Sequence, residues 1–429
     1  IQKESEKQAR IAEIERQYRA PALAHLRAAL AQGVESPAYA IGLVAMHEGH
    51  HEEALLRARE AFAAAPWLHE AKKLEGDVLF AMGSRTRHDK KAFDYQSTIH
   101  YFEQAAEAYG VAADLARSDP AIHEAECELW TQAMNAAAEH GDSMRPMFER
   151  ARGACERAIR VSPRSSSGRL KLAFAHLSFA FWVVNGMHDG ESPEQALSQA
   201  TERVEAAARM SPDDAFASYL VGAVWRARAS YTVKLGRDAT AAIDRAVAGY
   251  EAALALDPAF LWALNEQCAA LSLRGKVEAQ RGLDPAPTFA LALARCDRAI
   301  ALDPDFMFPK ATSVNVYIRD AERLVAAGLS PQPAVEKGMA LIAAAEAQDP
   351  TWQWIPFWRA ALLRTQAEYA IAKGEDPAAA LARAEASAGQ FAAGRASHPD
   401  ADADAAVGEI AAVSAEARLA RRERGEGPR

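Results

Sequence analysis

Apolar and polar positions along the chain form long alanine-rich blocks separated by short polar turns, as in EAALALDP and MALIAAAEAQDP. Alanine favours the helix and lets helices approach closely. One type of turn reads Gly, any residue, Asp or Ser, and Pro, and it recurs with a period of 46 residues. Its glycines are Gly190, Gly236, Gly282, Gly328 and Gly374, and only the copy at Gly236 lacks the proline.

The residue types in this turn predict the end of one helix and the start of the next. Glycine supplies the left-handed conformation that ends a helix, and Asp or Ser accepts hydrogen bonds from the first N–H groups of the next helix. Proline fits the first helical position because its missing N–H has no partner there. A second turn closes each repeat, at Pro212, Pro258, Pro304 and Pro350 and, more loosely, at Pro66, Pro120, Pro163 and Pro399. Together the turns predict about eight antiparallel helix pairs, with helix A of roughly 22 and helix B of roughly 18 residues.

The small residues of these helices are spaced as in the tetratricopeptide repeat, which this chain resembles in a form longer than the usual unit of about 34 residues. They are Gly76, Gly222, Cys268 and Ala360 in helix A, and Ala207, Ala253, Ala299 and Ala345 in helix B. The resemblance implies an all-α fold, a right-handed superhelical solenoid whose A helices line a concave groove. We expect a charged N-terminal helix or cap at 1–30, irregular repeats at 31–163, regular repeats at 164–399, and a capping helix with a basic tail at 400–429.

Composition and charge narrow the classes of function. The 429 residues carry a net charge of −9, which argues against a nucleic-acid partner because phosphate binding needs a basic face. No apolar run reaches the roughly 18–20 residues of a membrane span, and no cofactor is expected. Because the chain begins with Ile1, we expect a fragment or a processed form. A cytoplasmic location is favoured, with an extracytoplasmic sensor region as the alternative if a membrane span precedes the chain.

Several strings also resemble the C-terminal repeat region of large bacterial serine/threonine protein kinases. Among them are RIAEIERQYRAPALAHLRAAL and the succession of DPxF and GxDP. The chain has no Gly-rich phosphate loop, no His-Arg-Asp and no Asp-Phe-Gly. The resemblance therefore implies a non-catalytic sensor or substrate-recruitment region, with a kinase domain in cis as one partner.

The favoured function is a scaffold that holds a protein or peptide on its A helices. The alternatives are a small-ligand receptor or helical-repeat enzyme with a pocket between helices, and a self-assembling scaffold that forms a homo-oligomer. Asn can bind a peptide backbone, Arg a carboxylate, and aromatic rings supply contact area. The candidate groove residues are Tyr219, Arg226, Asn265, Asn315, Arg319, Phe357, Trp358 and Arg364.

Aromatic residues also follow each closing proline by four positions, at Phe216, Trp262, Phe308 and Trp354. This aromatic stripe is either part of the groove or core between repeats. A second candidate surface is an insertion near 84–98 in the second repeat, because insertions in solenoids map to one face and often touch partners. Its basic residues are Arg85, Arg87, Lys90 and Lys91.

Two further patterns carry candidate chemistry. His47, Glu48 and His51 match H-E-x-x-H, but that zinc site needs both histidines on one continuous helix, and the repeat places Gly49 at a turn. We therefore expect no metal there. Cys127 and Cys155 are equidistant from Gly141, and Cys268 and Cys296 from Gly282, so each pair lies at one level of a helix hairpin. These cysteines either fill small core positions as free thiols or form disulfides.

Overall fold

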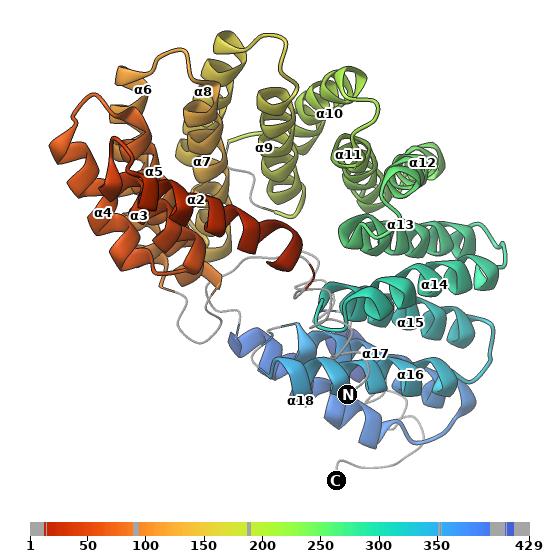
Figure 1. The fold of residues 1–429 in the computed structure, drawn as a ribbon. Coiled ribbons are helices and arrows are strands. Elements are labelled where there is room, and N and C mark those ends of the chain that lie inside the picture. Colours follow the sequence, from red (N-terminus) through yellow and green to blue (C-terminus); the bar gives the residue numbers. More distant parts are fainter. Residues whose placement is uncertain are drawn as a thin grey trace. The chain divides into compact units, whose positions relative to one another are not determined.

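The computed structural model describes residues 13, 15–88, 94–186, 190–350, 352, 354–394, 408 and 410–415. In this part of the chain the regular structure is helical, and no strand occurs (Figure 1). The chain divides into two compact units, Ile1–Phe179 and Ala180–Arg429, and the boundary falls inside a single helix.

The first unit is a succession of antiparallel helix pairs. A helix contacts its own partner and the first helix of the following pair, as α3 does with α4 and α5. The A helices are α3, α5 and α7, and the B helices are α4, α6 and α8. The elements are η1 (Glu15–Arg19), α2 (Ala20–Gln32), α3 (Pro37–Glu48), α4 (His51–Ala64), α5 (His69–His88), α6 (Tyr95–Leu115), α7 (Pro120–His140), α8 (Arg145–Val161) and α9 (Ser167–Val184).

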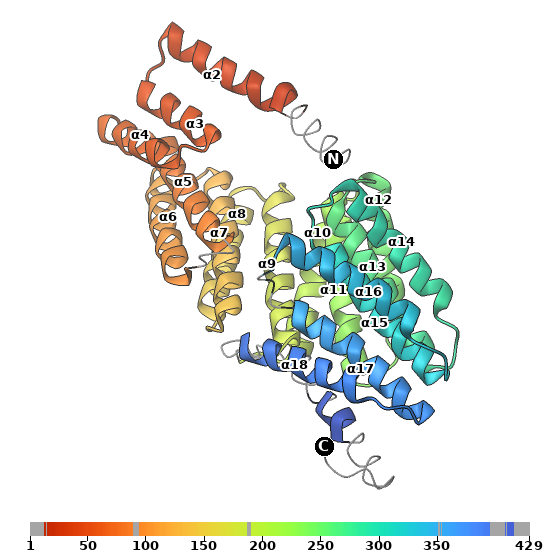
Figure 2. The ribbon, with the colours of Figure 1, turned by 90° about the horizontal axis from the view of Figure 1, so that it is seen from below.

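The second unit repeats this arrangement with the more regular period, and its stacked helices can be followed in both ribbon views (Figures 1 and 2). The A helices α11, α13, α15 and α17 each contact the next A helix directly, so they form one continuous layer. The elements are α10 (Pro193–Met210), α11 (Ala215–Lys234), α12 (Thr240–Leu256), α13 (Leu261–Gln280), α14 (Ala286–Leu302), α15 (Phe308–Ala326), α16 (Gln332–Gln348), α17 (Ile355–Lys373) and α18 (Ala378–Gly394). Residues 410–415 are helical as well.

The predicted helix-ending turns are confirmed. All five glycines of the 46-residue series have a positive φ, between 67° and 77°. The capping residue that follows does what the sequence predicts: Asp284 Oδ1 accepts from the N–H of Ala286 at 3.1 Å, and Asp376 Oδ1 from that of Ala378 at 3.0 Å. At Gly236, Gly282, Gly328 and Gly374 the turn therefore directly follows helix A, and in all five turns the Asp or Ser side chain accepts from one N–H at the start of helix B.

Small residues bring the helices of a pair into close contact. One close crossing joins α11 and α12, where Gly249 faces the backbone of Gly222. A Cβ atom on Gly249 would lie 2.5 Å from the backbone nitrogen of Gly222, and one on Gly222 would lie 2.6 Å from the ring of Tyr250. A side chain on Gly249 would meet the backbone of Gly222, and a side chain on Gly222 would meet the ring of Tyr250. Only glycine therefore fits at both positions.

Both cysteine pairs are disulfide-bonded in the structure. Cys127 on α7 and Cys155 on α8 have Cα atoms 5.1 Å apart, and Cys268 on α13 and Cys296 on α14 have Cα atoms 5.7 Å apart. These distances fall within the usual range for a disulfide, and all four residues are fully buried. The pairing is the one expected from their equal distances to Gly141 and Gly282.

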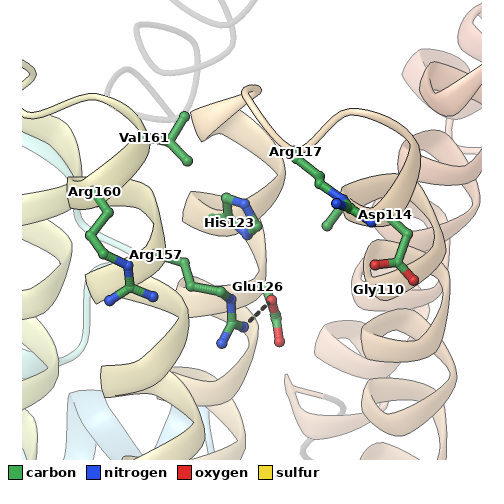
Figure 3. Close-up of a pocket in the computed structure, with 9 residues that line it drawn as sticks. Gly110, Asp114, Arg117, His123, Glu126, Arg157, Arg160 and Val161 are labelled. Carbon is green, nitrogen blue, oxygen red and sulfur yellow. Dashed lines mark hydrogen bonds and ion pairs between the residues drawn. The ribbon is translucent and has the colours of Figure 1, made fainter.

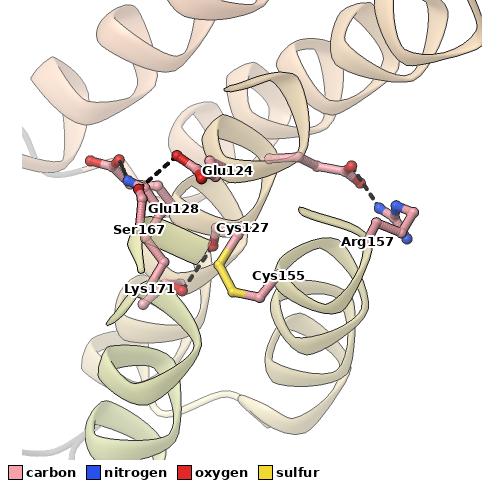
Figure 4. The surroundings of a disulfide bond; sticks show 9 residues. Glu124, Cys127, Glu128, Cys155, Arg157, Ser167 and Lys171 are labelled. Atoms are coloured by element: carbon pink, nitrogen blue, oxygen red, sulfur yellow. Dashed lines mark hydrogen bonds and ion pairs between the residues drawn. A yellow bond between two sulfur atoms is a disulfide. The ribbon is translucent and has the colours of Figure 1, made fainter. Parts of the chain in front are cut away.

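Polar bonds surround the first disulfide and tie α7 to α9 (Figure 4). The ammonium of Lys171 donates to Glu128 at 2.6 Å, and the hydroxyl of Ser167 donates to Glu124 at 2.7 Å. The covalent link thus joins the two helices of one pair, whereas hydrogen bonds and an ion pair join that pair to the next helix.

None of the described helices combines the length and the apolar composition that crossing a bilayer requires.

Replacing both Cys127 and Cys155 by serine should lower the free energy of unfolding by about 3–4 kcal/mol, because the cross-link closes a loop of 28 residues in the unfolded chain. Denaturant unfolding of the oxidised proteins measures this. A reductant should destabilise the native protein, and a variant with all four cysteines replaced should not respond to it. Equal stability of the native protein with and without reductant would show that the cysteines are free thiols.

Replacing Gly249 by alanine should cost about 1–3 kcal/mol, since the new methyl group forces α11 and α12 apart. Gly389 on α18 is the matched control: it is exposed, and nothing lies within 4 Å of an added Cβ. There the same change should stabilise the helix by up to about 1 kcal/mol. The two variants are compared by chemical denaturation, and similar effects of the two changes would contradict the close crossing.

Candidate functional site

The candidate site lies on the layer of A helices in the second unit. A pocket of about 180 Å³ opens on three consecutive A helices and on residue Ile410 near the end of the described chain. Its lining from the A helices is Lys276 of α13, Asn315, Ile318, Arg319 and Glu322 of α15, and Phe357, Ala361 and Arg364 of α17. The structure thus brings together four of the residues that the sequence predicts for the groove.

Two of those four are held by internal partners. The guanidinium of Arg364 forms ion pairs with Glu322 of α15 and, at 3.0 Å, with Glu368, and only 12% of its side chain is exposed. Arg319 donates to the hydroxyl of Ser272 on α13 at 2.7 Å. Both arginines therefore join neighbouring A helices to each other.

The charge of Arg319 is placed in a partly desolvated position. Burial lowers the pKa of its guanidinium; nearby Glu322 opposes this shift and nearby Arg226 adds to it. An arginine stays protonated even so, because its ordinary pKa lies far above neutral pH. Arg319 therefore contributes a fixed positive charge to the pocket.

The other two predicted residues are Asn315 and Phe357, and the pocket adds Lys276. In the part of the chain that the structure describes, the side chains of Lys276 and Asn315 have no hydrogen-bond or ion-pair partner. Phe357 is half-buried and held by the rings of Trp354 and Phe391, with centroids 5.6 and 5.3 Å away. An ammonium, an amide and an aromatic ring thus lie on one surface and are available to a partner.

The remaining predicted groove residues have structural roles. Arg226 forms a 2.5 Å ion pair with Glu266, and Asn265, which is 3% exposed, donates to the same carboxylate at 3.1 Å. The amide oxygen of Asn265 also accepts from Thr312 of α15 at 2.8 Å. These polar groups are therefore used to join the A helices rather than to face a ligand.

Two aromatic members of the predicted set lie among other rings. Tyr219 packs against Phe260 with centroids 5.2 Å apart, and burial raises the pKa of its phenol, which Glu266 raises further. Trp358 is 5% exposed and meets Trp352 edge-on at 5.0 Å. Both side chains therefore contribute to packing between consecutive repeats.

The aromatic stripe lies where consecutive repeats meet and keeps one edge exposed. Trp262 and Phe308 are 41% and 46% exposed, yet their ring centroids are only 4.8 Å apart. Phe308 continues the contact to Trp352 at 6.1 Å. The rings therefore pack repeat against repeat and also present apolar surface.

Lys276, Glu322 and Ile410 line the pocket although the sequence does not single them out. Glu322 is three residues after Arg319, so helical spacing alone could have found it. Ile410 lies beyond the last repeat, where the 46-residue period offers no register for placing it.

The predicted insertion mainly lengthens two helices. Arg85 and Arg87 lie on α5, which runs to His88, whereas Lys90 and Lys91 lie outside the described residues. Arg85 is exposed, but the side chain of Arg87 is only 10% exposed and donates to both carboxylate oxygens of Glu139, at 3.0 and 2.5 Å. Arg87 therefore joins α5 to α7 and is not available to a partner.

The H-E-x-x-H string is divided between two helices. Helix α3 ends at Glu48, Gly49 takes a φ of 79°, and α4 begins at His51. The predicted turn at Gly49 is therefore confirmed, and His47 and His51 do not lie one turn apart on one helix. Among the described residues, no group of three or more His, Cys, Asp or Glu side chains is arranged to hold a metal ion.

Comparisons with known proteins give resemblances of fold only. No family model matches the chain, and no curated protein matches it. It is similar to a tetratricopeptide repeat protein from Parabacteroides merdae ATCC 43184, with 12% identity over 76% of this chain and 97% of that one, at a TM-score of 0.44. It is also similar to yeast Tom70, with 11% identity over 97% of each chain and a TM-score of 0.37. A third similar structure is YrrB, a TPR protein with an unusual peptide-binding site, with 15% identity over 59% of this chain and 95% of that one, at a TM-score of 0.29.

Replacing Arg87 by alanine should lower the free energy of unfolding by about 1–3 kcal/mol, because charge-assisted hydrogen bonds to Glu139 are lost. Arg85 on the same helix is the matched control, since it is exposed and has no described partner. Its replacement by alanine should leave stability unchanged within about 0.5 kcal/mol. Thermal and chemical unfolding of both variants checks this, and an equal loss at the two positions would refute a structural role for Arg87.

Proposed function

We propose that the chain is a non-catalytic scaffold that binds a protein or peptide on the A helices of its second unit. The observation that carries this is the A-helix pocket, where Lys276 and Asn315 lie beside the ring of Phe357. Neither side chain has a hydrogen-bond or ion-pair partner among the described residues. The other polar residues predicted for the groove, Arg226, Asn265, Arg319 and Arg364, are bound to groups of neighbouring A helices. These three side chains are therefore the ones a ligand can use.

The size and chemistry of the pocket fit one side chain of a peptide. About 180 Å³ is smaller than the roughly 300–1,000 Å³ of sites that enclose a drug-sized ligand. The amide of Asn315 can both donate to and accept from a peptide backbone, and the ammonium of Lys276 suits a carboxylate. An acidic residue next to an apolar one is therefore the sequence we expect in the ligand.

The finer proposal is that this scaffold is the sensor or substrate-recruitment region of a bacterial serine/threonine kinase. The support for it is the likeness of the quoted strings to such regions. The two disulfides favour an oxidising compartment, so we propose the extracytoplasmic location over the cytoplasmic one that the sequence favours.

A charge reversal at the pocket tests the proposal. The double variant Lys276→Glu with Asn315→Ala should lose the partners that the native chain captures from its source organism, as measured by quantitative mass spectrometry. We choose these residues over Arg319 and Arg364 because removing either arginine would also break contacts between helices.

The matched control is Lys337→Glu, which reverses an exposed charge on α16, a B helix. It should capture the same partners as the native chain, and all three proteins should have the same melting temperature. A partner list that the double variant leaves unchanged would refute the groove. Capture of the chain itself, with a mass by light scattering that rises with concentration, would favour the self-assembling scaffold instead.

A further inference from the structure

A second pocket lies in the first unit and shares no residue with the A-helix site. It has a volume of about 450 Å³ and is formed by the end of α6, the connection that follows it, the first turns of α7 and the end of α8 (Figure 3). The pocket therefore touches two consecutive B helices and the A helix between them. Its size is in the range of small-molecule sites.

Three arginines reach this pocket from two sides. Arg157 and Arg160 project from α8, and Arg117 projects from the connection between α6 and α7 (Figure 3). Arg157 forms a 2.6 Å ion pair with Glu126 of α7. Arg117 and Arg160 have no hydrogen-bond or ion-pair partner for their side chains among the described residues. Two guanidinium groups are thus free to take an anion.

The other titratable groups leave the pocket with a positive surplus. Its carboxylates are Glu126, which is paired with Arg157, and Asp114, which lies one helical turn before Arg117. With three guanidinium groups and two carboxylates, the fixed charge is +1, in a chain whose net charge is −9. An anion is therefore attracted to this part of an otherwise acidic protein.

A buried histidine lies between the arginines. His123 is 6% exposed and lines the pocket, and its Nδ1 has no hydrogen-bond partner among the described residues. Burial lowers the pKa of the imidazole and Arg157 lowers it further, while Glu126 and the carbonyl of Arg117 act against this shift. A buried polar atom without a partner costs free energy, so a ligand that pairs with it is bound more strongly.

We propose that this pocket binds a small molecule that carries a phosphate group, either as the free ion or as a monoester. A phosphate offers oxygens in several directions and up to two negative charges, so guanidinium groups on opposite sides can bind it together. A carboxylate has one plane and one charge. The volume beyond the phosphate leaves room for the organic part of an ester.

The position of the pocket gives binding a structural effect. A ligand that touches α6, α7 and α8 bridges two neighbouring helix pairs, and it binds the folded arrangement but not the unfolded chain. Such a ligand raises the melting temperature by mass action. The site is independent of the A-helix pocket, so either proposal can fail without the other.

Isothermal titration of the full chain tests the proposal with inorganic phosphate, inorganic pyrophosphate, adenosine monophosphate and malonate as probes. The phosphate probes should bind and raise the melting temperature. Arg117→Gln and Arg160→Gln should each weaken binding by about tenfold or more, the loss expected for one charge-assisted contact. Arg85→Gln removes an exposed, unpartnered charge from the same unit and should leave the affinity unchanged.

Tighter binding of adenosine monophosphate than of inorganic phosphate supports a monoester as ligand, and equal affinity supports the free ion. Three results overturn the proposal: no heat and no thermal shift with any phosphate probe, malonate bound as tightly as the phosphates, or the same loss of affinity in Arg85→Gln as in the pocket variants. Circular dichroism of each variant shows that it is folded, so a loss of binding is not a loss of structure.

Discussion

The left-handed turn between the two helices of each pair is the constraint on which the second unit depends. Gly282 and its counterparts end helix A at a fixed residue. Each residue of helix B therefore lies opposite a particular residue of helix A. Cys268 therefore meets Cys296, and Gly222 meets Gly249. The period then places equivalent residues of consecutive A helices side by side, which produces the aromatic contact between Trp262 and Phe308.

The sequence predicts features that lie within one helix hairpin better than contacts between helices of different repeats. Turns, caps and cysteine levels follow from residue type and distance along one hairpin, and these predictions hold. The period identified the face that Arg319 and Arg364 share, but it does not say which polar groups pair across helices. Asn265 bonds to Thr312 of the next A helix, a contact that depends on how far the helices are shifted along each other. Ile410 lies outside the period altogether.

The charged residues of the chain divide into those that join helices and those that remain free. In the A-helix layer, Arg226 and Arg364 are bound to carboxylates of other helices, whereas Lys276 has no partner among the residues that the structure describes. In the irregular repeats of the first unit, Arg157 is bound to Glu126, whereas Arg160, three residues later, has no partner within the described ranges. Residue type does not separate the two groups, so candidate binding residues emerge only when the internal partners are known.

The two disulfides link helices within a pair and never across pairs. Under tension, the chain between the two cysteines of a cross-linked hairpin therefore cannot be extended, while the noncovalent contacts between neighbouring pairs can separate. A repeat array stretches and bends mainly at such contacts between neighbours. The cross-links thus hold together the two helices of their own pair and leave the contacts between consecutive pairs to noncovalent interactions alone.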